Sequence, residues 1–588
     1  MTPDSIIQAT QSTPGEEPSD PATLLTRNVS SPSLPLSLKA FGGMAFTFKA
    51  TASSNSEPRS PSGATEHSAP TPVSICSAAL SNEDILALIF QEVDGSFCVE
   101  DLKKRNQSLL RAAQTSKAFF RPAVSALWRR IHSLVPLLTI LPQFKASTES
   151  VHKLNVAVQT LVGQISDKDW ARFEMYARSV RVLDLALPSE TVGGDVYIQL
   201  ARLHPDPLLP GLQRMNIPTI ADGSTDTLAP LFHCISSTLL SVNIGSMDGP
   251  KAELLTTSFL SALSRDAVGL RYLSIDARIS PEAIDILSKS PSVNNLQLSI
   301  YSAIPKSKFA TLLGLPAVSS VTINFFGTGS LAGNLSGKAI SQFQLKAMRI
   351  SGNGDQIKQV FDTLLLIPCG LEDVDLFFQN ASFTGILYAW QCAPRTLRRL
   401  KLETPHSTPL PELRLRDFST YPSNIVALEL KGFRLQATDD DILKICKTGH
   451  WRNLEKLYLP CFGIESPDSL SSPSINILGE ISASCPKLCS LYICVDLRLH
   501  DHDKLRKALL ANIGSRTPSH KLKGLEISSV RSPKKAAFHQ GLVLAQYIDS
   551  VFPHLSSLAA YGNNDGEYWD EIWRTETLVT TEAISLQK

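Results

Sequence analysis

The side chains that could do chemistry form no recognisable catalytic or metal-binding set. Cys485, Cys489 and Cys494 lie close together, but their spacing is not the Cys-x-x-Cys of a zinc site. The segment Ser351–Asp355 is rich in glycine but lacks the lysine of a phosphate-binding loop. The sequence contains no Gly-x-Ser-x-Gly or His-Glu-x-x-His motif. We therefore expect no enzyme, no metal and no cofactor, because an enzymatic role would rest on these two weak signals alone.

A more informative set of residues lies between the apolar positions of a repeated motif. In a strand, alternate residues point to opposite sides, so these residues face away from the motif's leucines. Aromatic and arginine side chains are enriched where proteins contact one another. The five candidates for contact with a protein substrate are Asp373, Phe377, Arg399, Lys401 and Tyr458. Most strand-surface residues of this kind are only solvated, so partner contact by these five is a hypothesis.

The motif that carries these candidates is Leu-x-x-Leu-x-Leu, with other apolar residues allowed at the leucine positions. It occurs fourteen times at spacings of 23 to 34 residues. The copies begin at Val180, Leu212, Leu239, Leu270, Val293, Val318, Leu345, Leu371, Leu397, Ile425, Leu454, Leu488, Leu522 and Leu555. Leucine-rich repeats run about 20–29 residues, so the longer spacings indicate insertions or irregular turns. The last two apolar positions point to one side of a strand, and the first packs beneath it.

Helical segments lie between the copies. Ser280 is expected to cap a helix whose first residue, N1, is Pro281. Thr438 is expected to cap another helix, whose first turn carries three aspartates. Prolines such as Pro291 stop the helix shortly before the next motif. The predicted fold class is therefore α/β, a leucine-rich-repeat-like solenoid over residues 150–575 with a curved parallel sheet and outer helices. The candidate contact residues would lie on its concave face.

A separate helical pattern precedes the repeats. Apolar residues recur at helical spacing in residues 80–90, with Ser81 as the expected N-cap. Residues 95–107 are expected to form a loop, a second helix follows, and Pro122 is expected to open a third. Three short helices bury little surface by themselves. We therefore expect this module to complete its core against a partner or a neighbouring domain.

Three stretches of this module carry a family resemblance. They are LSNEDILALIF at 80–90, LLRAAQTSKAF at 109–119 and ALWRR at 126–130. They resemble the F-box family, whose pattern is Leu-Pro-x-Glu-[Ile/Leu]-Leu-x-x-Ile-Phe, a variable loop, a second conserved stretch and a closing Leu-Trp. Residues 129–138 are similar to the continuation found in many F-box proteins of mushroom-forming fungi. The resemblance covers residues 78–142, which we predict to be an F-box with a linker helix.

An F-box implies binding to the adaptor protein Skp1 and, through it, to a cullin-RING ubiquitin ligase. The Skp1-binding residues that the resemblance carries over are Leu80, Ile85, Leu86, Ile89, Phe90, Leu109, Leu110 and Phe119. Some of these are expected only to pack the helices together, since an interface needs few anchors. The predicted function is a substrate-recognition adaptor of such a ligase, with a protein substrate on the repeats. The alternative is an F-box and repeat scaffold that acts outside a ligase.

Composition excludes several other classes of function. The 588 residues carry a net charge of +1, which gives no footprint for nucleic acid or an anionic membrane. No apolar run approaches the roughly 20 residues that span a bilayer, and the first residues do not resemble a signal peptide. Ten cysteines are too sparse for a disulfide framework, so we expect an intracellular protein, cytoplasmic or nuclear. Residues 1–72, with ten of the 37 prolines, are predicted to be disordered.

Overall fold

The computed structural model describes most of the chain between residues 82 and 561. The described residues are 82–95, 102–146, 158–185, 191–192, 194–219, 229–247, 250–334, 344–365, 370–380, 383–405, 412–418, 424–459, 473–496, 507, 520–529 and 538–561. They all belong to one compact unit that runs from Ala64 to Lys588. The predicted disordered tail at 1–72 lies outside the described residues, and so does Leu80.

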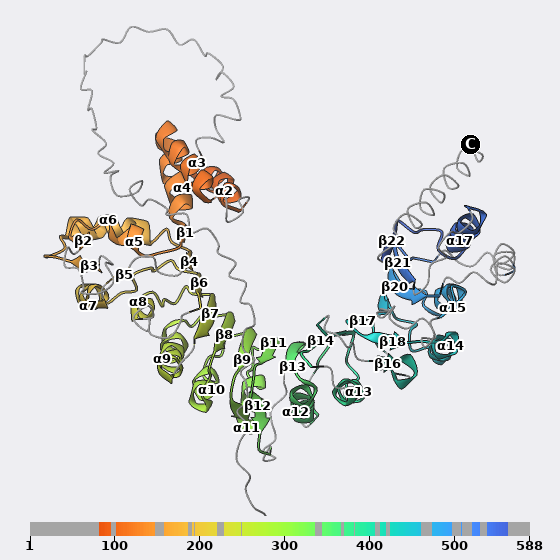
Figure 1. Cartoon of the computed structure of the whole chain (residues 1–588). Coiled ribbons are helices and arrows are strands. Elements are labelled where there is room, and N and C mark those ends of the chain that lie inside the picture. Colours follow the sequence, from red (N-terminus) through yellow and green to blue (C-terminus); the bar gives the residue numbers. More distant parts are fainter. Residues whose placement is uncertain are drawn as a thin grey trace, which may run out of the picture. The chain divides into compact units, whose positions relative to one another are not determined.

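The repeated motif forms one long parallel sheet (Figure 1). Within the described residues this sheet has fifteen strands, and each pairs with the next one along the array. The strands are β1 (Arg130–Ile131), β4 (Val182–Asp184), β6 (Arg214–Ile217), β7 (Ser241–Met247), β8 (Tyr272–Ala277), β9 (Asn295–Ile300), β11 (Ser320–Phe325), β13 (Ala347–Gly352), β14 (Asp373–Phe378), β15 (Arg399–Glu403), β17 (Ala427–Lys431), β19 (Lys456–Leu459), β20 (Ser490–Val495), β21 (Gly524–Ser529) and β22 (Ser557–Tyr561). The fourteen motif copies supply β4 to β22, and β1 adds a strand before them. This confirms the coarse prediction of an α/β fold with a solenoid-like repeat.

Burial explains why the motif specifies this sheet. Val374 and Leu376 on β14 are 3% and 0% exposed, and Leu371, the first position of the same copy, is fully buried. The register pairs Leu376 with Leu402 on the next strand, so equivalent leucines of neighbouring repeats lie side by side. The same stacking continues along the array and joins the buried side chains into one continuous core. Each repeat therefore buries its apolar positions against its neighbours, as expected for a solenoid.

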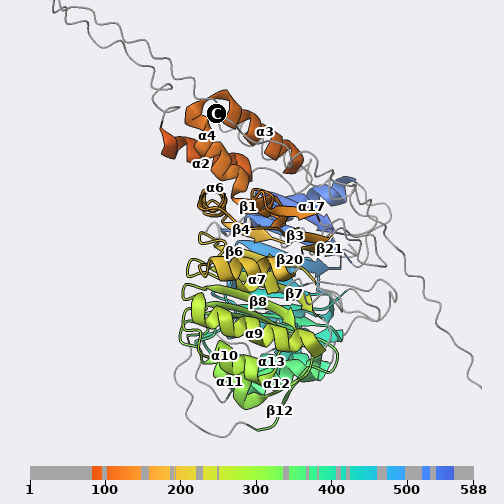
Figure 2. The same cartoon turned by 90° about the vertical axis from the view of Figure 1, so that its left-hand side faces the viewer.

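Helices cover one face of the sheet (Figure 1). They are α6 (Asp167–Ala177), α7 (Gly194–Leu203), α8 (Ala229–Phe232), α9 (Pro250–Asp266), α10 (Pro281–Leu287), α11 (Lys306–Leu313), α12 (Gly354–Leu364), α13 (Phe383–Gln391), α14 (Asp439–Thr448), α15 (Ile477–Ser484) and α17 (Phe538–Val551), with a 3-10 turn η4 (Leu415–Phe418). Figure 2 shows α7, α9, α10 and α11 following one another in chain order. Ser280 caps α10 and Thr438 forms a capping box with Asp441 on α14, which confirms both predicted helix starts.

In the described part of the chain, three small sheets lie outside the long sheet, in the segments that connect its strands. They are β2 (Phe144–Ala146) with β3 (Val158–Leu161) and β5 (Thr191–Val192), β10 (Ala303–Pro305) with β12 (Ser330–Ala332), and β16 (Glu412–Arg414) with β18 (Arg434–Gln436). Gly432 turns the chain between β17 and β18 with a φ of 74°. A Cβ atom added there would collide with the carbonyl oxygen of Thr404. This turn therefore requires glycine for both conformation and space.

In the described part of the chain, three helices precede the sheet and form a module with a core of its own. They are α2 (Glu83–Gly95), α3 (Leu102–Thr115) and α4 (Lys117–Trp128). Asn82, rather than Ser81, caps α2, because its side-chain oxygen accepts from the backbone N–H of Asp84. The helix α4 begins at Lys117, five residues before Pro122, because Ser116 caps it. The predicted loop and the predicted proline start were therefore wrong at these boundaries.

The early start of α3 has a tertiary cause. Residues 103–107 are polar and form part of the segment expected to be a loop, yet they are helical. Arg105 on this turn is only 2% exposed, and its Nη2 donates to the carbonyl oxygen of Ala126 at 3.0 Å, near the end of α4. An arginine that satisfies a C-terminal carbonyl stabilises both helices. This contact is between segments 21 residues apart, so local sequence does not reveal it.

Candidate interaction surfaces

Three of the predicted Skp1-binding residues are buried inside the helical module. Leu86, Phe90 and Leu109 fill its core together with small alanines of α3 and α4. Phe119 is half-buried, and its ring meets that of Phe90 edge to face at 5.8 Å. Leu110 is also half-buried. Leu86, Phe90 and Leu109 therefore hold the three helices together.

The helix α2 presents an apolar face away from that core. Ile85, Leu88 and Ile89 are 39%, 64% and 45% exposed. Their positions i, i+3 and i+4 place them together on one side of the helix. We call these three residues the α2 patch. The prediction included Ile85 and Ile89 but missed Leu88, although its spacing from Ile85 could have indicated it.

The module joins the repeat array almost without a linker. Trp128, the last residue of α4, packs on Tyr176 of α6 with ring centroids 5.2 Å apart. Arg129 then accepts hydrogen bonds from the backbone N–H groups of Arg181 and Val182, and β1 begins at the next residue. The sheet thus takes its first strand from inside the segment 78–142. The short helix α5 (Val135–Leu138) also contributes its leucines to the core of the array.

The sheet has a second face, which we call the open face. It is formed by the first, third and fifth residues of each strand, which alternate with the buried leucines. On β15, for example, Arg399, Lys401 and Glu403 are exposed or half-buried, whereas Leu400 and Leu402 are buried. The register places Arg399 beside Asp373 and Lys401 beside Asp375. Side chains at the same position of neighbouring repeats therefore form rows across the strands.

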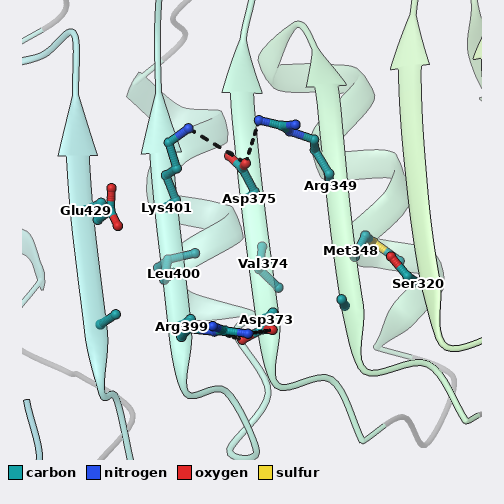
Figure 3. A pocket seen from close by; sticks show the side chains of 12 residues that line it. Ser320, Met348, Arg349, Asp373, Val374, Asp375, Arg399, Leu400, Lys401 and Glu429 are labelled. Carbon is teal, nitrogen blue, oxygen red and sulfur yellow. Dashed lines mark hydrogen bonds and ion pairs between the residues drawn. The ribbon is translucent and has the colours of Figure 1, made fainter. Parts of the chain in front are cut away.

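From β13 to β19 the open face carries a network of ion pairs, which we call the charged segment, and Figure 3 shows its central part. Its members are Arg349, Asp373, Asp375, Arg399, Lys401, Glu403, Glu429, Lys431 and Lys456. Arg399 forms a two-pronged pair with Asp373 on the neighbouring strand. Asp375 Oδ2 lies 3.0 Å from Arg349 Nη2 and 3.8 Å from Lys401 Nζ. Three of the five predicted contact residues, Asp373, Arg399 and Lys401, are thus brought together here.

A hollow opens at the centre of the charged segment. Its volume is about 250 Å³, and its lining includes Asp373, Asp375, Arg399 and Lys401. Ala347 and Ala427 also line it, on strands β13 and β17. These small side chains stand in the same row as Asp373 and Arg399, which leaves space beside the longer ones. The hollow is large enough to receive a side chain of another molecule.

Glu429 is held between two lysines. Its carboxylate lies 2.8 Å from Lys456 Nζ and 3.2 Å from Lys431 Nζ. Burial raises the pKa of the Glu429 carboxyl, but the hydrogen bonds from Lys456 and Lys431 outweigh it, so the pKa lies below its ordinary value. Glu429 is therefore ionised at neutral pH and keeps both lysines on the open face.

Aromatic rings follow the charged segment along the same row. Tyr458 stacks on Tyr492 of the next strand with centroids 4.0 Å apart. Lys431 Nζ lies 5.2 Å from the centre of the Tyr458 ring, a cation–π distance. Phe377 is half-buried at the fifth position of β14, in register with Glu403. All five predicted contact residues therefore lie on the open face, and their role in binding stays a prediction.

Arg349 belongs to this network but was not among the five predicted contact residues. It occupies the same motif position as Asp375, Lys401, Glu429 and Tyr458, the fifth residue of each copy. Reading that position down successive copies gives Arg, Asp, Lys, Glu and Tyr. The signal was therefore present as a column across repeats, whereas inspection of one copy at a time does not show it.

The earlier strands of the open face are different, and we call β7, β8, β9 and β11 the neutral segment. At the first and third positions they carry Ser241, Asn243, Tyr272, Ser274, Asn295, Gln297, Ser320 and Thr322. None of these residues is charged, and the one charged residue at the fifth positions, Asp276 on β8, accepts a hydrogen bond from the Tyr301 hydroxyl at 2.7 Å. Tyr272 donates its hydroxyl hydrogen to Gln297 at 3.2 Å, which joins neighbouring strands without ions.

The described cysteines do not form a metal site. No group of three or more His, Cys, Asp or Glu side chains that could hold a metal ion occurs in the described part of the chain. Cys485 ends α15, Cys494 lies in β20, and the Cys489 thiol donates to the carbonyl oxygen of Lys487.

Every helix in the described part of the chain is too short or too polar to cross a lipid bilayer.

Comparison with known proteins gives only a faint structural likeness. No protein-family model matches the chain, and no curated protein matches it significantly in sequence. Among solved structures, the chain is similar to one in the crystal structure of the Rad7 and Elc1 complex in yeast. The identity is 14%, the match covers 66% of this chain and 77% of that chain, and the TM-score is 0.26. A TM-score this low supports no inference about fold or function.

Proposed function

We propose that this chain is a substrate-recognition adaptor of a ubiquitin ligase of the Skp1–cullin–F-box type. The helical module α2–α4 would be the F-box and would bind Skp1. The open face of the repeat array would bind a protein substrate. The chain itself would contribute no chemistry, since its effect would be to raise the local concentration of substrate near a ubiquitin-conjugating enzyme.

The α2 patch is the observation that carries this proposal. Ile85, Leu88 and Ile89 expose aliphatic surface although the module already has a filled core. Clustered exposed apolar side chains on a small domain are typical of a protein–protein contact. The patch lies within the stretch that resembles an F-box, which supports Skp1 as the partner. Leu110 and Phe119 are half-buried, so they are secondary candidates for the same contact.

Affinity purification of the full chain from cells tests the proposal. The informative variant is Ile85→Asp with Leu88→Asp and Ile89→Asp, because these side chains are exposed and the module should still fold. Leu254→Asp is a matched control, since this leucine of α9 is 70% exposed and lies far along the chain. Leu86→Asp or Phe90→Asp would be uninformative, because a buried charge unfolds the module.

The expected result is recovery of Skp1 and a cullin with the wild type and with Leu254→Asp, but not with the α2 variant. Recovery of Skp1 without a cullin would favour a scaffold outside a ligase. Absence of Skp1 from the wild-type sample would overturn the F-box assignment. Circular dichroism of the variants checks that loss of binding is not loss of folding.

A further inference from the structure

The charged side chains of the charged segment fall into two groups that differ in how far they are exposed to solvent. Arg349, Arg399 and Lys456 have side chains that are 48% to 67% exposed. The carboxylates Asp373, Asp375, Glu403 and Glu429 are only 17% to 31% exposed. Lys401 and Lys431 lie deeper than the projecting cations, at 26% and 36%. A molecule that approaches this face therefore meets cations first, although the segment as a whole is nearly balanced.

The deep charges hold the projecting ones in place. Arg349 pairs with Asp375, Arg399 with Asp373, and Lys456 with Glu429. A guanidinium has five N–H donors, and the pair with Asp373 uses two of those of Arg399. The projecting cations thus keep donors for a second carboxylate. In the row formed by the third residue of each strand, the next carboxylate after Glu429 is Glu526 on β21, and Tyr458 and Tyr492 lie between the two.

The hollow offers a further contact that suits a polypeptide. Asp375 Oδ1 is buried and has no hydrogen-bond donor among the described residues. A buried acceptor without a donor is energetically unfavourable, because it has lost its hydrogen bonds to water. A backbone N–H of an extended chain can supply that donor, whereas a phosphate backbone has none. The hollow of about 250 Å³ beside it gives such a chain room to approach.

The spacing of the projecting cations fits an extended chain. Arg349 is on β13, Arg399 on β15 and Lys456 on β19, so successive cations are two strands apart. At roughly 4.8 Å between strands, this separation is about 10 Å across the strands, with Arg349 at the third position of its strand and Arg399 and Lys456 at the first. A chain in the polyproline II conformation advances about 3.1 Å per residue with three residues per turn, so about three residues span each step and every third side chain points to the same side. Acidic side chains at every third residue of such a chain would meet the three cations in turn.

We propose that the charged segment binds an extended acidic stretch of a partner protein, with its carboxylates on Arg349, Arg399 and Lys456. This inference rests on the proposed function, because it names the chemical class of segment that the repeat array would recognise. The neutral segment would not take part in charge recognition, since its first and third positions carry no cation.

Fluorescence anisotropy with the full chain tests this inference. The probe is a labelled peptide with glutamate at every third residue in a glycine–serine background, and its counterpart carries glutamine instead. Arg349→Gln with Arg399→Gln removes two positive charges from the charged segment. Asn243→Glu with Asn295→Glu lowers the net charge by the same amount on exposed positions of the neutral segment, and is the matched control.

We expect the glutamate peptide to bind and the glutamine peptide not to bind. The arginine double variant should weaken binding about tenfold, because each exposed ion pair contributes up to about 1 kcal/mol. The asparagine double variant should weaken it less, since Asn295 and Asn243 lie two and four strands from Arg349, about 10 and 19 Å, which is at or beyond the Debye length of about 8–10 Å. Binding should weaken as salt rises.

Three outcomes would overturn the inference. They are equal binding of the two peptides, equal weakening by the two double variants, and tighter binding of a DNA oligonucleotide that displaces the peptide. Failure here is separable from failure of the proposed function. The α2 variant should still bind the peptide, and the arginine double variant should still recover Skp1.

Discussion

The neutral and charged segments of the open face stand on the same support. Leu298 on β9 and Leu376 on β14 occupy the same motif position, are 1% and 0% exposed, and belong to one continuous core. The open faces above them nevertheless differ, with amides and hydroxyls on one segment and an ion-pair network on the other. The comparison teaches that a repeat fold separates two tasks. The leucines build the array, and the residues between them are free to vary.

The energetic reason is that the two sets of residues contribute unequally to stability. Truncation of a buried leucine to alanine lowers the free energy of unfolding by about 2–5 kcal/mol. An exposed ion pair contributes only about 0–1 kcal/mol to it. A change from Gln297 to a charged residue therefore barely affects folding, but it changes what the face can bind.

The largest effect is expected in the shared core. Leu298→Ala and Leu376→Ala should each lower the free energy of unfolding by about 2–5 kcal/mol. Both leucines are buried at the same motif position, so the two losses should be similar. Urea unfolding followed by circular dichroism measures them. A large loss at only one position would show that the two segments do not share equivalent support.

Glu429→Gln should have the next largest effect, about 1.5 kcal/mol at neutral pH, because it removes charge-assisted bonds from two lysines. The folded pKa of Glu429 lies below its ordinary value, so its ionised form stabilises the fold above that ordinary value. This contribution disappears as the pH falls through about 4 and then through the folded pKa. Melting temperatures of wild type and variant should therefore converge in acid, and a constant difference would contradict the pairing.

Reversal of one exposed pair should cost less. Arg399→Glu places two carboxylates side by side and should destabilise by at most about 1 kcal/mol, since the pair is exposed and screened. The double variant Asp373→Arg with Arg399→Glu restores opposite charges and should recover most of that loss. Denaturation at low and high salt measures both. If the double variant does not recover stability, Asp373 and Arg399, which lie together in Figure 3, do not stabilise each other.

The smallest effect belongs to the neutral segment. Tyr272→Phe removes the hydroxyl that donates to Gln297 and should destabilise by about 0.5 kcal/mol. Because no charge is involved, the loss should be the same at low and high salt. A salt dependence as large as that of Arg399→Glu would contradict the distinction between the two segments.

Much of the fold could be predicted because it depends on local patterns. The strand β14 is an example, since Val374 and Leu376 are two residues apart and must both face one side of it. Ser280 and Thr438 cap their helices through bonds to residues three positions away. Contacts of this kind join residues that are close in the sequence, so they can be predicted from the sequence.

The candidate sites could be predicted only in part, because they depend on distant partners. Leu86 and Leu88 are both apolar and lie on the same helix, yet one is buried and the other exposed. The difference comes from α3 and α4, which pack on one side of α2 and leave the other. In the same way, Asp373 and Arg399 are 26 residues apart and meet only because β14 and β15 align in register.

The repeat period, the strands and the buried leucines follow from the sequence alone, because hydrophobic periodicity needs no knowledge of distant contacts. The residues that face away from those leucines follow from it as well. In contrast, which charges project and which lie deep, where a hollow opens, and which apolar side chains of α2 remain exposed become visible in the folded chain only. These features depend on neighbours brought together by packing, and the identity of those neighbours is set by register across strands and helices.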